Sequence, residues 1–232
     1  MIIGSGLLAR AFPGTFISRP DVCIYAAGVS NSSCADVREF ARERERLADA
    51  LHRTANVDAF VYFGTCSVAD PEVRDTPYVQ HKLAMEKMVC AHPQSLILRL
   101  PQVAGKTPNP HTLLNFLYAR ISRSESFKLW SKAERNIIDV VDVAAIARQL
   151  IADSSVRNVT VNVANVVNYP MTEIVGAMEH VVGKRAVYEI VERGSAFRID
   201  ASALLPVLGK AGIEFGNDYL AKVIGRYYGR SV

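Results

Sequence analysis

The sequence has no apolar run that approaches the length of a membrane span. It contains 232 residues, of which 50% are hydrophobic and 22% are charged, whereas a transmembrane helix needs about 18–20 consecutive apolar residues. The first residues, MIIGSGLLARAF, carry no basic leader, so we expect no signal peptide. Such a chain is typical of an ordinary soluble globular protein with one substantial core, or one core and a small lobe.

Cysteine is scarce, and the spacing of the cysteines indicates neither a disulfide framework nor a zinc site. The four cysteines, Cys23, Cys34, Cys66 and Cys90, match no zinc or disulfide pattern. We therefore expect no metal site, and we expect reduced thiols in the cytoplasm. Cys66 follows a strand end, and a nucleophilic role for it is disfavoured because no histidine is evident to orient it.

The net charge is also small, at a formal +4 at pH 7. The basic residues are scattered and do not alternate with aromatic ones, so the sequence does not indicate a nucleic-acid binder. A mild positive charge suits small anionic ligands such as nucleotides. The densest charged run, VREFARERERLADALHR, is interpreted as the solvated face of an amphipathic helix.

The first hundred residues alternate between apolar strands and helices. Strands are predicted over Met1–Ile3, Asp21–Ala27, Ala59–Phe63 and Ser95–Leu100, and helices over Leu7–Phe12, 35–53 and from Pro77 to about Cys90. Strands without polar alternation indicate a parallel sheet buried on both faces, in which ligands bind at the carboxyl ends of the strands. Residues 4–6, Gly28, Thr65 and Pro101 all fall at such ends.

The second half has shorter elements. Helices are predicted over 112–123, 142–153, 171–183, 201–209 and 217–228, with strand-like FKLW, NIIDVV, VTVNVAN and AVYEIV between them. We divide the chain into a Rossmann-like dinucleotide-binding domain, residues 1–105, and a smaller α/β substrate lobe, residues 106–232, partly interwoven with the sheet.

Tyr78 and Lys82 carry the most specific chemical signal. They lie four residues apart, one helical turn, so the phenol and the ammonium share a face, and Thr65 could reach the same point from a strand end. A free phenol, with a pKa of about 10, is a poor acid or base at neutral pH, and lowering that pKa by about 3 costs roughly 4 kcal/mol. A nearby lysine could supply much of this. The same spacing also arises by chance.

The order of five motifs indicates a family. These are GSGLLA, IYAAG, FGTCSV followed by YVQHK, LRLPQVAG and RNIIDVVDVA. Over nearly its whole length the chain resembles the extended short-chain dehydrogenase/reductase superfamily, which comprises nucleotide-sugar epimerases, dehydratases and ketoreductases.

The resemblance implies site residues. Tyr78 would be the acid/base, Lys82 would lower its pKa and bind the nicotinamide ribose, and Thr65 would orient the reacting oxygen. Ser67, Gln102 and Arg135 would contact the substrate, with Asn136 beside Arg135 at its diphosphate. An NAD or NADP cofactor would be held by Gly4, Gly6, Leu7, Leu8, Ala26, Ala27, Gly28, Lys82, Pro101 and Val103.

Three departures from the family pattern stand out. Cys66 and Ser67 replace the acidic residues of the family's dehydratases, and the helix asparagine expected near 42–44 is not evident. Only residues 13–20 separate the first helix from the second strand, too few for the usual strand–helix–strand unit that holds the adenosine ribose. We therefore expect a sheet truncated on the adenine side, with the first strand at or near an edge, and weak cofactor binding. Neither Arg19 nor Asp21 can be assigned to the ribose.

Three functions remain open at this stage. The leading interpretation is an NAD(P)-dependent reduction of a nucleotide-linked keto-sugar in polysaccharide precursor synthesis, with Thr65, Tyr78 and Lys82 as the catalytic triad. A nucleotide-sugar epimerase would use the same residues. A non-catalytic nucleotide-binding module would explain the truncation. A homodimer through helices 35–53 and 78–90 is plausible by resemblance.

Overall fold

A five-stranded parallel sheet forms the centre of the fold. The computed structural model describes residues 1–229 except 13 and 18. The strand order is β1-β2-β3-β4-β8. The strands are β1 (Ile2–Ile3), β2 (Val22–Tyr25), β3 (Ala59–Thr65), β4 (Ser95–Leu100) and β8 (Val159–Asn162). The Rossmann-like fold class predicted from the sequence is confirmed.

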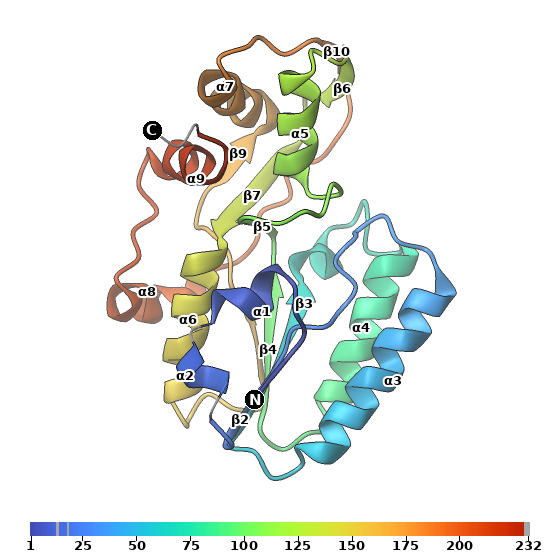
Figure 1. The fold of residues 1–232 in the computed structure, drawn as a ribbon, viewed down its shortest axis with the longest axis vertical. Helices are drawn as coiled ribbons and strands as arrows, with labels where there is room; N and C mark the ends of the chain where they lie inside the picture. Colours follow the sequence, from blue (N-terminus) through green and yellow to red (C-terminus); the bar gives the residue numbers. More distant parts are fainter. Residues whose placement is uncertain (13, 18, 230–232) are drawn as a thin grey trace.

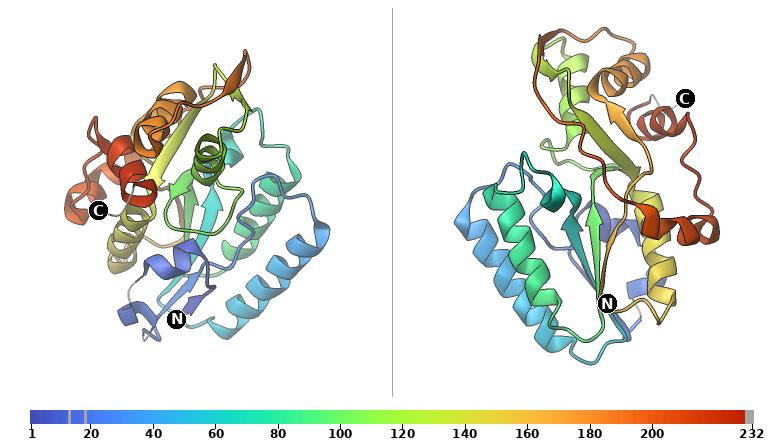
Figure 2. Two further views of the ribbon diagram at one scale, coloured as in Figure 1. Left: turned by 45° about the horizontal axis from the view of Figure 1, so that its top comes forward. Right: turned by 180° about the vertical axis from the view of Figure 1, so that it is seen from behind.

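Two helical layers cover this sheet (Figures 1 and 2). One layer consists of α3 (Val37–Arg53) and α4 (Pro77–Val89), and the other includes α1 (Leu7–Ala11), α2 (Gly14–Ile17) and α6 (Val140–Ala152). Successive residues of each strand point to opposite layers, as the pleat requires. Tyr62 thus packs under α3 and α4, whereas Val61 and Phe63 pack with α6.

Strand β1 is an edge strand of the sheet. The sequence analysis predicted this because residues 13–20 are too few for a further strand–helix–strand unit. It pairs only with β2, through Ile2–Ile24 and Ile3–Tyr25. The sequence left open on which face the first helix lies. It packs against α6, with Leu8 and Phe12 in the core cluster of that face. Since β1, β2 and β3 run parallel and in order, the β1–β2 connection has the opposite hand to β2–α3–β3, despite the usual right-handed preference.

The connection itself differs in detail from the prediction. It contains the short helix α2, which the sequence analysis did not predict, while residues 13 and 18 lie outside the described part. Arg19 forms an ion pair with Asp21, at the amino end of β2. Both residues therefore lie at the opposite end of the strand from the carboxyl edge of the sheet, where a ligand would bind. This agrees with assigning neither of them to a ribose.

A second group of elements lies beyond the carboxyl ends of the strands (Figure 1). Strands β5 (Gln102–Ala104), β7 (Glu134–Asp139) and β9 (Asn168–Pro170) form one small sheet, and β6 (Phe127–Trp130) pairs with β10 (Tyr188–Val191). Their apolar faces pack with α5 (Leu113–Ser122), α7 (Met171–Val182) and α9 (Tyr219–Tyr228).

The chain passes back to the main sheet twice. Strand β8, which precedes β9, pairs with β4, and after β10 the short helices η2 (Ser202–Leu204) and α8 (Leu205–Ala211) pack near β8 and α6. The lobe is thus interwoven with the sheet, and the boundary at residue 105 stays a prediction. Among the described residues, no helix combines the length and the apolar character that crossing a bilayer would require.

The turn after β1 supplies a test of how the edge strand is held. Gly4 has φ +124°, and a Cβ there would lie 2.4 Å from the carbonyl oxygen of Ala26, whereas a Cβ on Gly6 would meet nothing within 4 Å. We expect Gly4→Ala to lower the free energy of unfolding by about 1–3 kcal/mol through backbone strain and the clash. Gly6→Ala, the matched control, should cost less than about 1 kcal/mol. Urea unfolding measures both, and equal effects would contradict this view of the turn.

Candidate functional site

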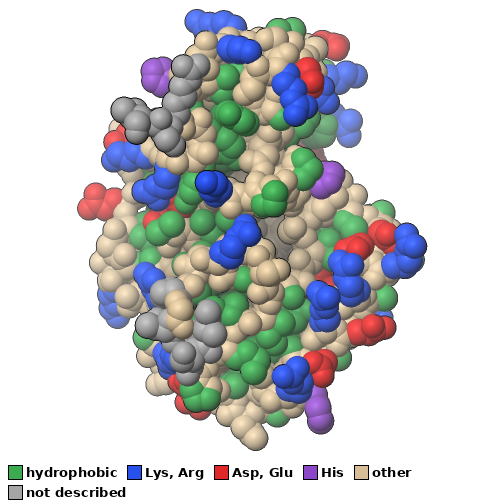
Figure 3. All heavy atoms as spheres, viewed as in Figure 1, with side chains coloured by type: hydrophobic (Ala, Val, Ile, Leu, Met, Phe, Trp, Pro, Cys, Tyr) green, Lys and Arg blue, Asp and Glu red, His purple; other side chains and the backbone are tan. Residues whose placement is uncertain are grey.

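A cleft of about 1270 Å³ lies at the carboxyl ends of the strands, between the sheet and the second lobe. Figure 3 shows the surface hollowed near the middle of this face, with basic side chains close by. The glycine turn after β1, the β2–α3 loop, the end of β3, the start of α4 and strands β5 and β7 all contribute to its walls. The predicted site residues that line it are Gly6, Leu7, Leu8, Ala26, Ala27, Gly28, Thr65, Ser67, Tyr78, Lys82, Pro101, Gln102, Val103 and Arg135.

Gly4 is the exception among the predicted cofactor residues. It lies in a separate hollow between β1 and α3, together with Arg46 and Arg53. Its Cα faces the backbone of Ala26, which explains why glycine is needed there without any ligand. Gly4 therefore shapes the turn, and Ser5 and Gly6 form the part that faces the cleft.

A buried carboxylate, Glu43 of α3, organises the α4 wall of the cleft. Its Oε1 accepts hydrogen bonds from Lys82 Nζ at 3.2 Å and from the Tyr62 hydroxyl at 2.9 Å. Its Oε2 lies 2.9 Å from His81 Nε2 and 2.6 Å from the backbone nitrogen of Val29. Only 2% of Glu43 is exposed. One side chain thus joins α3 to α4, to β3 and to the loop after β2.

These contacts decide the charge of Glu43. Burial by itself would raise the pKa of the carboxyl, but the hydrogen bond from His81, the charge of Lys82 and the N–H of Val29 outweigh it and lower the pKa to about 2. Because an ionised carboxylate only accepts hydrogen bonds, His81 Nε2 must carry a proton and donate it. The ring of His81 is further held by stacking on Phe40, with centroids 4.4 Å apart.

The position of Glu43 corrects the interpretation of its helix. The charged run was expected to be a solvated face, yet Glu43 lies on the buried stripe of α3 with Leu47 and Ala50. The spacing 43, 47, 50 is the signal that could have revealed it, since an acidic residue at an apolar position of the repeat needs a buried partner. Glu43 also falls in the region where the family's asparagine was sought.

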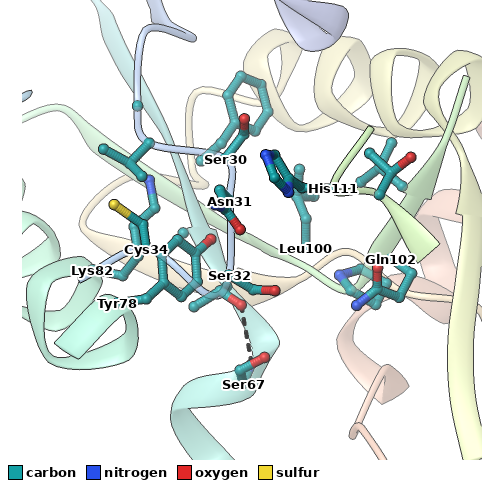
Figure 4. Close-up of a pocket in the computed structure, with 18 of the residues that line it drawn as sticks. Ser30, Asn31, Ser32, Cys34, Ser67, Tyr78, Lys82, Leu100, Gln102 and His111 are labelled. Atoms are coloured by element: carbon teal, nitrogen blue, oxygen red, sulfur yellow. Dashed lines mark hydrogen bonds between the residues drawn. The ribbon is translucent and has the colours of Figure 1, made fainter. Parts of the chain in front are cut away.

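Tyr78 and Lys82 lie side by side on the α4 wall (Figure 4), so the structure brings the predicted pair together. The ammonium, however, donates to Glu43 and, at 3.2 Å, to the Tyr62 hydroxyl. Room around it is limited, because a Cβ on Gly28 would lie 2.6 Å from Nζ. Lys82 is therefore fixed mainly by Glu43.

The expected lowering of the Tyr78 pKa is not what the structure shows. Burial raises the pKa of this phenol above its usual value, the negative charge of Glu43 raises it further, and a hydrogen bond with Thr65 opposes both. The main physical reason is burial of the phenol, and the charge of Glu43, which also pairs with the ammonium of Lys82, adds to it. Thr65 ends β3, and its hydroxyl accepts from the Ser67 N–H at 3.2 Å; its predicted catalytic role stays a prediction.

The opposite side of the cleft carries Arg135, from β7. Its Nη1 donates to the carbonyl of Glu134 at 2.7 Å, and in the described part of the chain no carboxylate lies within ion-pair distance of it. Burial lowers the pKa of its guanidinium, against the attraction of Asp70 and Glu72. A half-buried guanidinium without a counter-ion, facing a cleft, suits an anionic ligand.

Asn136, in contrast, holds the lobe together. Its amide nitrogen donates to the carbonyl of Asn165 at 2.8 Å, and its amide oxygen accepts from the Asn165 N–H at 3.0 Å. Its amide is thus engaged within the lobe, although Asn136 also lines the cleft, and its expected contact with a diphosphate stays a prediction.

Cys66 does not fit a nucleophile either. Burial raises the pKa of its thiol to about 12, and its Sγ lies 3.3 Å from the carbonyl oxygen of Arg99. A protonated, hydrogen-bonded thiol is a poor nucleophile.

The comparison with protein families agrees with this geometry. The sequence model of the NAD dependent epimerase/dehydratase family matches residues 10–164. The chain belongs to this family. The match begins after the Gly4–Gly6 turn, so the turn is assigned by its place after β1. A search of curated proteins found no match.

Solved structures share the fold at low sequence identity. RMD from Pseudomonas aeruginosa complexed with NADPH has a TM-score of 0.68 and 17% identity, over 90% of this chain and 80% of that one. The UDP-glucose 4-epimerase of Thermus thermophilus in complex with NAD has a TM-score of 0.70 and 16% identity, over 94% and 81%. The UDP-N-acetylglucosamine 4-epimerase of Bacillus cereus has a TM-score of 0.68 and 19% identity, over 89% and 77%. The part of each that this chain leaves uncovered is consistent with the truncated sheet.

The dependence of the unfolding free energy on pH under acidic conditions tests whether the buried carboxyl of Glu43 is ionised. The pKa of Glu43 is about 2 in the folded protein against 4.5 ordinarily. The stability it confers is therefore complete above pH 4.5 and is lost as the pH falls toward about 2. At about 1.36 kcal/mol for each tenfold change in proton binding, this loss is about 3 kcal/mol.

We expect the difference in unfolding free energy between wild type and Glu43→Gln to shrink by about that amount over this pH range. Denaturant unfolding at a series of pH values measures it, and a difference that is constant with pH would contradict an ionised Glu43.

Proposed function

We propose that the protein is an NAD(P)-dependent oxidoreductase that reduces a nucleotide-linked keto-sugar. One observation carries this proposal: Thr65, Tyr78 and Lys82 line the same cleft as Gly6 and Arg135, and Tyr78 and Lys82 lie side by side there (Figure 4). Family membership supports the reaction class. Among the solved structures that share the fold, one is a complex with NADPH and another a complex with NAD, and several are named for UDP-sugars.

The residues of the cleft fit part of such a cofactor. Ser5 and Gly6 expose backbone at the turn after β1, and Pro101 and Val103 supply an apolar wall beside Tyr78 and Lys82. These groups suit the pyrophosphate and nicotinamide portions. The adenosine portion would lie beyond β1, where no further strand of the described chain exists to bind its ribose. We therefore expect binding to depend mainly on the nicotinamide half.

The residues divide the chemistry between them. A bound nicotinamide cofactor supplies the hydride. Tyr78 donates the proton to the oxygen that gains negative charge; burial raises the pKa of this phenol, so it is protonated at neutral pH but is a weak acid until that charge develops. Thr65, already within hydrogen-bonding reach of the phenol, orients the same oxygen. Lys82 holds a positive charge beside them and a hydrogen-bond donor for the ribose.

The substrate would extend across the cleft toward β7. Ser67, Gln102 and Arg135 line the cleft, and the guanidinium of Arg135 can pair with a diphosphate. In Figure 4, Ser67 and Tyr78 lie on one side of the cavity, and Gln102 and His111 on the other.

Two alternatives have specific support. An epimerase would use the same residues and present both faces of the keto-sugar, and several solved structures that share the fold are 4-epimerases of UDP-sugars. A non-catalytic nucleotide-binding module is favoured by the open edge at β1 and by the neutralisation of Lys82. A homodimer through α3 and α4 and a cytoplasmic location stay predictions.

Removing the phenol hydroxyl tests the catalytic assignment. We expect Tyr78→Phe to reduce turnover by about 10²–10⁴-fold, the usual contribution of a positioned acid or base, while cofactor binding and thermal unfolding stay near wild type. The assay offers UDP- and dTDP-linked sugars and keto-sugars with NAD(H) and NADP(H). Oxidation of the nicotinamide at stoichiometry with product indicates a reductase, and sugar isomers without net oxidation indicate an epimerase.

Tyr118→Phe is the control, because Tyr118 lies on α5 with 41% of its surface exposed and outside the cleft. Its turnover should match wild type. An equally active Tyr78→Phe variant would refute the role of Tyr78, and a wild-type protein that neither turns over nor binds nicotinamide cofactors would leave the binding module as the better account.

A further inference from the structure

Lys82 is a buried ammonium with one carboxylate beside it. Only 3% of the residue is exposed, and its Nζ lies 3.2 Å from Glu43 Oε1. The other buried acid of the neighbourhood, Glu86, is one helical turn further along α4 and forms an ion pair with Arg99 at 2.7 Å. A buried lysine without a counter-ion tends to lose its proton, because burial disfavours the charged form.

Elements on several sides of Lys82 bring ionisable groups close to it. The ionisable groups that face it or affect its charge are Glu43 of α3, Tyr62 of β3, Tyr25 of β2, and Tyr78, His81 and Glu86 of α4. Burial raises the pKa values of Tyr25, Tyr62 and Tyr78, so these phenols stay neutral at physiological pH. The negative charge comes from Glu43 and, more weakly, from Glu86. Burial lowers the pKa of Lys82, and Glu43 is the largest influence that raises it.

The carboxylate also fixes where the ammonium points. Glu43 is itself held by Tyr62, His81 and the Val29 N–H, so it cannot follow a moving lysine. An ammonium has three N–H groups. Two of them are used by Glu43 and Tyr62, which leaves one for a ligand in the cleft that Lys82 lines.

We propose that Glu43 is a positioning residue for Lys82: its carboxylate keeps the ammonium charged and leaves one of its N–H groups for a ligand in the cleft. Glu43 itself forms the buried side of this pair and acts on the ligand through Lys82. The consequence for catalysis rests on the proposed function, but the charge of Lys82 can be measured without any turnover.

The direct test follows the Nζ signal of Lys82 by nuclear magnetic resonance in protein labelled with ¹⁵N-lysine, assigned by its loss in Lys82→Arg. We expect the wild-type signal to remain that of an ammonium at alkaline pH, and the midpoint in Glu43→Gln to fall by at least one pH unit, a tenfold or greater change in proton affinity. Glu45→Gln is the matched control, because it removes the same charge from an exposed position of the same helix. Its midpoint should equal that of wild type.

A second variant covers the case in which Glu43→Gln does not fold. Glu43→Asp keeps the charge but withdraws it by one methylene group, so the midpoint should fall by a smaller amount. Equal midpoints in wild type, the folded Glu43 variants and Glu45→Gln would overturn the proposal.

The kinetic readout separates this proposal from the function it builds on. If Lys82 acts in the charged form, kcat/KM of Glu43→Gln should decline at the pH where its Lys82 loses the proton, a pH at which wild type and Glu45→Gln remain active. An inactive wild type with a shifted Lys82 midpoint supports the Glu43 assignment and refutes the function. An active, Tyr78-dependent wild type with an unshifted midpoint refutes the Glu43 assignment alone.

Discussion

The hydrogen bonds and the ion pair of the Glu43 carboxylate hold together the carboxyl edge of this sheet, where the cleft lies. It receives donors from α4, β3 and the β2–α3 loop, so four segments that meet at the cleft are held by one buried charge. A buried ion pair of this kind is expensive to desolvate, and breaking it by removing one partner typically costs about 3–5 kcal/mol. Its value lies in geometry, because Lys82 and the loop that begins at Gly28 cannot move independently of each other.

The same contact changes how Tyr78 works. With its charge shared with Glu43, Lys82 does not make a phenolate accessible in the free protein, and burial keeps the phenol protonated. A phenol that stays protonated at neutral pH is a weak acid, so it can pass on its proton only to an oxygen that gains strong negative charge during the reaction.

Much of the fold follows from local pattern in the sequence. Apolar strands such as 59–63 and 95–100 alternate with helices, and the eight residues 13–20 are too few for the missing unit, so both the parallel sheet and the edge position of β1 were predictable. Less predictable were features set by tertiary packing. The three-residue strands β5 and β9 and the helix α2 are too short to show a periodicity, and the face on which α1 packs depends on its contact with α6.

The site, too, contains residues that the sequence pattern predicted and others whose roles depend on tertiary packing. Thr65, Tyr78 and Lys82 have a characteristic order and spacing, and the structure brings them to one wall. The spacing 43, 47, 50 could have marked Glu43 as buried, but its partner His81 lies 38 positions further along the sequence, on another helix, and no local pattern identifies it. Asn136 shows the converse, because its place in the sequence suggested ligand binding while its amide is used within the lobe.

The central claim is that this truncated sheet holds a nicotinamide cofactor by the half that lies between the Gly6 turn and Lys82. Calorimetric titration of the protein with NADH, NADPH and reduced nicotinamide mononucleotide tests it most directly. The account predicts that both dinucleotides bind no more than about tenfold tighter than the mononucleotide, a gain of about 1.4 kcal/mol from the adenosine half. Nanomolar binding of one dinucleotide, with strong selectivity over the other and over the mononucleotide, would contradict it.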